Sequence, residues 1–334
     1  MAVRHGAVAT AAVLLALVPV AGCSSDGAGP RDAAPAPSQP AGGSAASPSA
    51  AVKAVPGPYV ALGDSYTSGP RVPPQTGTPA GCERSGADYP ALVAAALGLG
   101  GADFRDVSCS GATTTDLGRP QRTSGGTNPA QLDALTSATR LVTVGIGGND
   151  AGFMDVLTHC ARESLRASLR PGSGGTGDGA SATAPCRASY AAAGGGPDDV
   201  QRRVDAAGAK VADVLGEIRR RAPRAAVYVV GYPTLFPADA AACTDTVGDA
   251  VAPGDLAFLA EKQQQLNAML RERAAAAGAR FVDTAAASAG HDLCAGPEQR
   301  WIEPVLPAAG AAPLHPNALG ERGMAAAVLA AVRS

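Results

Sequence analysis

The chain has 334 residues and a formal net charge of −2. Hydrophobic residues make up 46% of it and charged residues 17%, a composition that excludes a solvated, disordered chain. Because the net charge is close to zero, there is no basic surface of the kind that binds nucleic acid, and we expect no nucleic-acid partner. The composition therefore favours a folded domain with a substantial core.

The first 22 residues have the features of a signal peptide. Arg4 precedes an apolar run from Ala7 to Ala21, which is shorter than the roughly 20 residues that span a bilayer. The run ends in Val-Ala-Gly-Cys at positions 20–23, which resembles a bacterial lipobox, where the cysteine is diacylated and the peptide is cut just before it. We expect an exported protein that is lipid-anchored at Cys23 to the outer face of the cell membrane; secretion without an anchor is the alternative.

A linker and one domain are predicted to follow. Residues 23–57 are mostly Ala, Pro, Ser and Gly with almost nothing to bury, which is typical of a disordered tether. Residues 58–334 have the length of one large α/β domain.

Cysteine usage agrees with export. With Cys23 set aside, an even number of cysteines remains, which indicates disulfides in an exported chain. They are Cys82, Cys109, Cys160, Cys186, Cys243 and Cys294. Their spacing alone leaves the pairing open. A zinc site is the competing interpretation, but the chain has no C-x-x-C pair.

Short apolar runs alternate with helical stretches along the predicted domain. The runs are 58–62, 103–107, 141–146, 225–230 and 279–283, and they are typical of strands buried on both faces of a parallel sheet. Helices are predicted over 88–97, 197–221, 256–277 and 316–332, and a mobile insertion over 171–185. This alternation predicts a three-layer, doubly wound α/β domain whose ligands bind at the carboxyl ends of the strands.

Four segments place polar groups at those strand ends or before the last helix. Gly-Asp-Ser at 63–65 exposes the Ser65 hydroxyl after the first strand, and Gly111 lets the main chain approach a ligand after the second. Gly-Gly-Asn-Asp at 147–150 brings the Asn149 carboxamide to the same edge, and His315 precedes the last helix. Each segment alone suits an ordinary turn or cap. Together they indicate nucleophilic catalysis.

In this order the four segments resemble those of the SGNH, or GDSL-type, hydrolase family, and in particular its secreted Streptomyces-type lipases and esterases with three disulfides. The resemblance spans residues 59–334 and implies a flavodoxin-like α/β fold. It implies that Ser65 is the nucleophile, that the Ser65 and Gly111 N–H groups and Asn149 form the oxyanion hole, and that His315 is the general base. It also implies that neighbouring cysteines pair as Cys82–Cys109, Cys160–Cys186 and Cys243–Cys294.

We therefore expect a carboxylic ester hydrolase, a lipase or esterase, that forms an acyl-enzyme on Ser65. The alternatives are an inactive, surface-anchored binding protein of the same fold or, among enzymes, a phospholipase, thioesterase or glycan deacetylase. We expect no cofactor and no metal, because few histidines remain outside the signal peptide and no H-E-x-x-H motif exists. The expected partners are an ester or lipid substrate and, through Cys23, the membrane; we expect a monomer.

The chain departs from the family pattern at one position. Most members carry an Asp three residues before the catalytic His, where this chain has Ala312. Some Streptomyces-type relatives use a main-chain carbonyl there, so we predict that the Ala312 carbonyl accepts the Nδ1–H of His315. A carboxylate from elsewhere, Asp283, Asp292 or Glu303, is the alternative.

Overall fold

The structure is a computed structural model that describes residues 57–169, 183–237, 239, 243, 246, 251–307 and 310–334. The predicted signal peptide, Cys23 and all but the last residue of the predicted linker lie outside these ranges, as does most of the insertion predicted over 171–185. Within the described ranges, no helix combines the length and the apolar character that crossing a bilayer requires.

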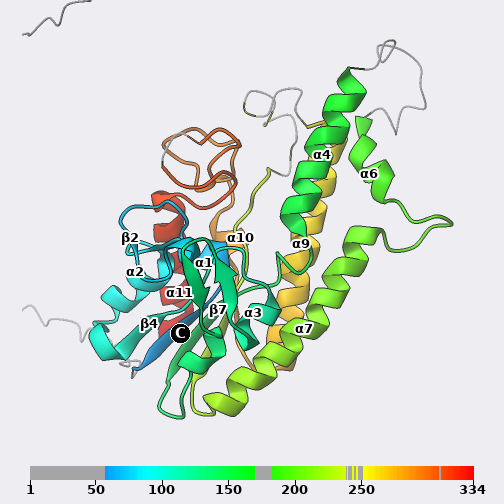
Figure 1. Ribbon diagram of the computed structural model, residues 1–334. Helices are drawn as coiled ribbons and strands as arrows, with labels where there is room; N and C mark the ends of the chain where they lie inside the picture. The colour runs from blue at the N-terminus through cyan, green and yellow to red at the C-terminus, as the bar shows by residue number, and fades with distance from the viewer. Residues whose placement is uncertain are drawn as a thin grey trace, which may run out of the picture. The chain divides into compact units, whose positions relative to one another are not determined.

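Five parallel strands form the central sheet in the order β4-β1-β7-β8-β9 (Figure 1). They are β1 (Tyr59–Gly63), β4 (Phe104–Asp106), β7 (Leu141–Gly145), β8 (Ala226–Val230) and β9 (Arg280–Val282). Numbered along the chain, these sheet strands run 2-1-3-4-5, which is the flavodoxin-like order. The predicted fold class is confirmed. The direction of winding reverses between β1 and β7, and ligand crevices open at such a point.

Helices cover both faces of the sheet (Figure 1). One face packs on α2 (Tyr89–Ala96) and α11 (Ala318–Arg333), and the other on α4 (Phe153–Ser168), α7 (Asp199–Arg221) and α9 (Pro253–Ala276). Successive residues of β1 point to opposite faces, so Tyr59 and Ala61 enter one core while Val60 and Leu62 enter the other. This two-sided burial explains why the strands are apolar along their length.

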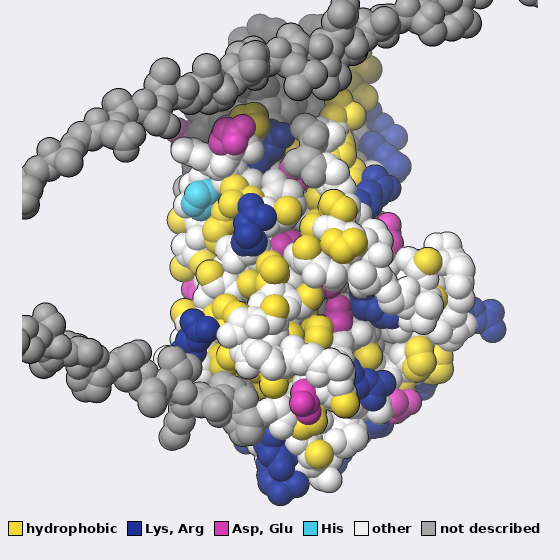
Figure 2. Space-filling view, turned by 90° about the vertical axis from the view of Figure 1, so that its left-hand side faces the viewer, with side chains coloured by type: hydrophobic (Ala, Val, Ile, Leu, Met, Phe, Trp, Pro, Cys, Tyr) yellow, Lys and Arg dark blue, Asp and Glu magenta, His cyan; other side chains and the backbone are white. Residues whose placement is uncertain are grey.

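Short elements complete the domain. They are the helices α1 (Ser65–Ser68), α3 (Thr114–Gly118), α6 (Pro185–Tyr190) and α10 (Thr284–Ala287), the 3₁₀ turns Ala80–Cys82, Gly101–Asp103 and Gln131–Ala134, and the paired strands β2 (Gln75–Thr76) with β3 (Arg84–Ser85) and β5 (Gln121–Thr123) with β6 (Gly126–Asn128). On the side of the molecule seen in Figure 2, acidic and basic side chains are interspersed among hydrophobic ones.

The four predicted helices are present as α2, α7, α9 and α11, with ends that differ by a few residues. Side-chain caps set three of the starts: Asp88, Asp198 and Asn317 accept main-chain N–H groups of the first turn. Helix α4 was not predicted. It follows the Gly-Gly-Asn-Asp turn, and buried residues recur along it at helical spacing, from Phe153 to Cys160.

The structure contains the three disulfides that the resemblance implies, Cys82–Cys109, Cys160–Cys186 and Cys243–Cys294. The first joins the segment before β3 to the loop after β4, which carries Gly111. The second joins α4 to α6. The first cross-link therefore fastens a loop at the carboxyl edge of the sheet.

Candidate active site

Ser65 is the first residue of α1, immediately beyond the end of β1. The preceding Asp64 caps this short helix, because its Oδ1 accepts the Tyr66 N–H at 2.9 Å. Gly63 is held on both sides by the buried side chain of Gln131, which donates to its carbonyl at 2.9 Å and accepts its N–H at 2.8 Å. Its φ of 155° is one that a glycine adopts readily. The turn that presents the Ser65 hydroxyl is therefore fixed from both ends.

His315 lies on the loop before α11, and its ring reaches Ser65. Its Nε2 is 2.8 Å from the Ser65 Oγ, and its Nδ1 is 2.7 Å from the main-chain carbonyl of Pro313. A carbonyl can only accept a hydrogen bond, so Nδ1 carries the proton and Nε2 is left to accept one from the serine. This is the tautomer in which a histidine can act as a general base toward Ser65.

The prediction that the Ala312 carbonyl holds Nδ1 is wrong, because the acceptor is the next residue. The Ala312 carbonyl instead accepts the main-chain N–H of His315 at 3.2 Å, closing a tight turn. Leu314, inside that turn, has a left-handed φ of 60°. The turn places the Pro313 carbonyl, two residues before the histidine, at the ring nitrogen.

The three alternative carboxylates have partners of their own. Asp283 pairs with Arg271 and caps α10, and Asp292 accepts the Cys294 N–H at 2.9 Å. Glu303 is fully buried and accepts the Asn317 Nδ2 at 2.9 Å. The acceptor that orients the imidazole is the Pro313 carbonyl.

The loop that carries His315 is closed at its base. The Glu303 N–H donates to the His315 carbonyl at 3.0 Å, and the Leu314 N–H donates to the Glu303 carbonyl at 2.9 Å. Asn317, bonded to the Glu303 carboxylate, also caps the start of α11. The histidine thus lies between a closed loop and a fixed helix end.

Gly111 and Asn149 lie on the loops after β4 and β7. Gly111 has a φ of 75°, in the left-handed region that favours glycine. The Asn149 Nδ2 donates to the Ala112 carbonyl at 2.8 Å, which joins the two loops. Asp150 adds to this connection between the two loops, since its carboxylate accepts the N–H and the hydroxyl of Thr114 at 2.8 and 2.7 Å. Both loops are therefore tied together at the edge of the sheet where β1 ends.

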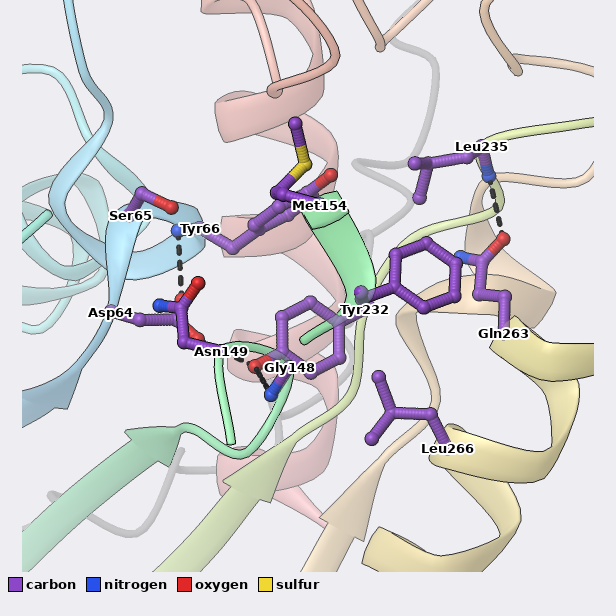
Figure 3. Close-up of a pocket in the computed structure, with 11 residues that line it drawn as sticks. Asp64, Ser65, Tyr66, Gly148, Asn149, Met154, Tyr232, Leu235, Gln263 and Leu266 are labelled. Carbon is purple, nitrogen blue, oxygen red and sulfur yellow. Dashed lines mark hydrogen bonds between the residues drawn. The ribbon is translucent and has the colours of Figure 1, made fainter. Parts of the chain in front are cut away.

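Tyr232, which follows β8, is a site residue that the sequence did not reveal. Its buried hydroxyl donates to Asp64 Oδ2 at 2.5 Å and accepts the Gly148 N–H at 2.9 Å (Figure 3). Its ring packs edge-on against Tyr66, with centroids 5.1 Å apart. Burial raises the pKa of Asp64 to about 7, although the hydrogen bonds from Tyr232 and the Tyr66 N–H lower it. The only signal in the sequence was the position of Tyr232 just beyond a predicted strand.

Burial lowers the pKa of His315 below its ordinary value. Two groups oppose this shift, the Pro313 carbonyl at Nδ1 and the negative charge of Glu83, whereas the positive charge of Arg71 adds to it. The imidazole is therefore neutral at neutral pH. A neutral imidazole is the form that can take a proton from a hydroxyl.

A pocket with an empty volume of about 380 Å³ opens beside Ser65. Figure 3 shows Ser65 and Asn149 at one end of it and Leu235, Gln263 and Leu266 at the other. The Gln263 side-chain amide forms hydrogen bonds with the main chain. Its oxygen accepts the Leu235 N–H at 3.0 Å, and its nitrogen donates to the Pro233 carbonyl. The far end of the pocket is therefore apolar.

The model of the GDSL-like Lipase/Acylhydrolase family matches residues 61–322. The chain belongs to this family. Over 269 residues it is 39% identical to Lipase 2 of Streptomyces coelicolor. The aligned region covers 80% of this chain and 83% of the relative. The chain is accordingly a carboxylic ester hydrolase of the GDSL type, as the sequence predicted.

Two solved structures share its fold. An extracellular lipase from Streptomyces rimosus is 32% identical with a TM-score of 0.61, over 82% of this chain and 98% of that one. A phospholipase A1 from Streptomyces albidoflavus is 29% identical with a TM-score of 0.59, over 83% of this chain and 99% of that one. The part of the chain that the structure describes contains no group of three or more His, Cys, Asp or Glu side chains that could hold a metal ion.

Proposed function

We propose that the enzyme cleaves esters through an acyl-enzyme on Ser65, with His315 as the general base. The observation that carries the proposal is the 2.8 Å distance between the Ser65 Oγ and the unprotonated Nε2 of His315. Nε2 takes the hydroxyl proton as Oγ bonds to the acyl carbon, and it then gives that proton to the departing alcohol. In the second half of the reaction, a water molecule gives a proton to Nε2 as its oxygen bonds to the acyl carbon. The bond from that carbon to the Ser65 Oγ then breaks, Nε2 returns the proton to Oγ, and the carboxylic acid is released.

The oxyanion of each tetrahedral intermediate needs donors on the opposite side of the carbonyl. We assign this role to the N–H groups of Ser65 and Gly111 and to the Asn149 carboxamide. A carboxamide has two N–H groups; one of those of Asn149 is bonded to Ala112, and we assign the second to the oxyanion. Losing one such donor typically raises the barrier by about 3 to 4 kcal/mol, so Asn149→Ala should lower kcat by about 100- to 1,000-fold.

The substrate is proposed to be an ester with an alkyl acyl chain, or a lipid ester. The apolar far end of the pocket beside Ser65 supports it, because an alkyl chain gains free energy on leaving water and needs no polar partner. A glycerophospholipid is the second candidate, favoured by the phospholipase A1 structure that resembles this chain.

A fluorophosphonate probe tests the proposed mechanism, since it forms a covalent bond with an activated serine. We expect the intact protein to be labelled, Ser65→Ala to remain unlabelled and His315→Ala to react far more slowly. Absence of labelling at every pH up to about 8, where the imidazole is neutral, would contradict the proposal. Hydrolysis of p-nitrophenyl esters of increasing length, alongside phosphatidylcholine, then separates simple esters from phospholipids.

We further propose that the hydrolase domain, residues 58–334, is exported and tethered. In this scheme residues 1–22 are removed, Cys23 is acylated and the chain up to residue 57 is the linker. The disulfides favour an oxidising compartment, and the Streptomyces rimosus relative is described as extracellular. Cys23→Ala should move the enzyme from the membrane fraction into the medium. An unmodified Cys23 found by mass spectrometry of the mature protein would contradict anchoring.

The enzyme is proposed to act as a monomer, because the residues assigned to catalysis all come from one chain. Size-exclusion chromatography of the active protein checks this. Activity that is confined to a larger species would contradict it.

A further inference from the structure

The hydroxyl of Tyr232 joins two segments that carry proposed catalytic groups. It donates to Asp64, the residue before Ser65, at 2.5 Å, and it accepts the N–H of Gly148, the residue before Asn149, at 2.9 Å. Figure 3 shows the phenol oxygen between these two turns, and the side chain is only 5% exposed. One buried oxygen therefore connects the nucleophile turn with the loop of the oxyanion hole.

We propose that Tyr232 is a positioning residue, whose hydroxyl sets the distance between the Ser65 nucleophile and the Asn149 carboxamide. The inference rests on the proposed function, in which both groups act on the same acyl carbonyl.

Tyr232 is itself held firmly enough to serve as a reference point. Its N–H donates to the Asn267 Oδ1 at 2.9 Å, and its carbonyl accepts the Asn267 Nδ2 at 2.8 Å. Asn267 belongs to the long helix α9, so the main chain of Tyr232 is fixed to the helical layer. The ring is packed against Tyr66. The position of the phenol oxygen is consequently set by the packing of the domain.

The glycine at position 148 fits this role. A Cβ there would lie 3.0 Å from the Tyr232 Oη and 3.1 Å from its Cζ, closer than such atoms normally approach. Glycine lets the main chain come against the phenol, so that the N–H can reach the oxygen. The second glycine of the Gly-Gly-Asn-Asp segment is thereby explained by a contact with the loop after β8.

Removing the hydroxyl should affect the transition state more than substrate binding. The ring of Tyr232 lines the pocket, and Phe keeps that ring. The two hydrogen bonds that would be lost restrain Asp64 and Gly148, the residues that precede the nucleophile and the oxyanion donor. Small displacements of reacting groups cost large factors in rate, so we expect kcat of Tyr232→Phe to fall by about 10- to 100-fold with KM within about twofold.

Tyr228→Phe is the matched control. Tyr228 lies on β8, is 3% exposed, and its hydroxyl accepts a hydrogen bond from Arg280 at 3.4 Å instead of meeting the site. The Tyr228→Phe variant loses the phenol oxygen of another buried tyrosine, from the strand that precedes Tyr232, and should keep kcat and KM. Steady-state kinetics on a soluble p-nitrophenyl ester and the rate of fluorophosphonate labelling of the full chain are the readouts.

An unchanged kcat in Tyr232→Phe, or an equal loss in Tyr228→Phe, would overturn the proposal. If circular dichroism shows that Tyr232→Phe does not fold, Gly148→Ala disturbs the same contact from the main-chain side and should also lower kcat; full activity there would overturn the proposal. An inactive wild type refutes the proposed function and the inference with it. An active wild type with a fully active Tyr232→Phe refutes the inference alone.

Discussion

The hydroxyl of Tyr66 donates a hydrogen bond of 2.6 Å to the main-chain carbonyl of Leu314. Because Tyr66 follows Ser65 and Leu314 precedes His315, one bond ties together the neighbours of the two proposed catalytic residues. The Tyr66 ring also lies beside the imidazole, with centroids 4.9 Å apart. In a chain that lacks an Asp three residues before its histidine, these contacts and the Pro313 carbonyl hold the ring in place.

Tyr66→Phe should lower kcat by about fivefold. The variant keeps the ring against His315 and loses only the bond to Leu314, and one such bond is worth about 1 kcal/mol net. Tyr59→Phe is the control, since it removes a buried hydroxyl bonded to Thr143 at 2.8 Å, and it should lose stability without losing kcat. Equal losses of kcat in the two variants would contradict a role for Tyr66 in holding the histidine.

Removing any of the three alternative carboxylates should cost far less activity than His315→Ala, because Nδ1 is bonded to the Pro313 carbonyl. The variants are Asp283→Asn, Asp292→Asn and Glu303→Gln, each measured by kcat on the same soluble ester. Thermal melts report any loss of folded enzyme separately. A loss in one of them as large as that of His315→Ala would restore the carboxylate hypothesis.

The acid limb of kcat/KM should lie below the ordinary pKa of histidine, because burial lowers the pKa of His315 and only the neutral ring accepts a proton. Glu83→Gln removes a negative charge that favours the imidazolium, so it should move the limb to lower pH. Arg71→Gln removes a positive charge and should move it to higher pH. Rate profiles from about pH 4.5 to 8 measure both shifts. Shifts in the same direction would show that these charges do not act on the catalytic imidazole.

The wall of the pocket should set the preferred acyl length. Met154→Trp fills space beside Ser65 and should shift the optimum toward shorter esters, whereas Leu266→Ala enlarges the far end and should shift it toward longer ones. Leu266→Ala also leaves a cavity in the core and should lower the free energy of unfolding by about 2 to 5 kcal/mol. Leu215→Ala, a buried change on α7, controls for that loss. An optimum that stays constant in both pocket variants would place the acyl chain elsewhere.

Glu321 should make the protein less stable as the pH rises. It is fully buried in α11, and its Oε2 accepts the Tyr89 N–H at 2.7 Å. Burial raises its pKa well above the ordinary value, so the folded state holds a proton that the unfolded chain releases. The stability due to that proton is complete at acid pH, below the pKa of the unfolded chain, and is lost as the pH rises through the folded pKa.

Glu321→Gln cannot ionise and keeps an acceptor for the Tyr89 N–H. Its melting temperature relative to the wild type should therefore increase between about pH 5 and about pH 8. Glu272→Gln, an exposed change on α9, should show no such trend. A constant difference between Glu321→Gln and the wild type across this range would mean that Glu321 does not titrate in the folded state.

The fold was predictable because parallel strands buried on both faces appear as unbroken apolar runs, as 141–145 does. The candidate site was predictable where a chemical group follows such a run directly, as Ser65 and Asn149 do. His315 follows no strand, and its assignment came from the family resemblance.

Other features depended on conformations and distances that no local pattern encodes. The acceptor of His315 is Pro313 because of a tight turn in which Leu314 is left-handed, and such a conformation is uncommon for leucine. Gln131, which forms hydrogen bonds with the main chain of Gly63, lies 68 positions away in the sequence. Tyr232 is one of six tyrosines, and only the packing of α9 shows which one reaches the nucleophile turn.

The hydrogen bonds between Glu303 and Leu314 and between Glu303 and His315 hold together the two ends of the loop that leads into the histidine. Length changes within that loop would be absorbed at its tip, because both ends remain clamped to each other. Insertions at the tip would leave in place the Pro313 carbonyl that orients the imidazole, since Pro313 lies at the fixed end of the loop.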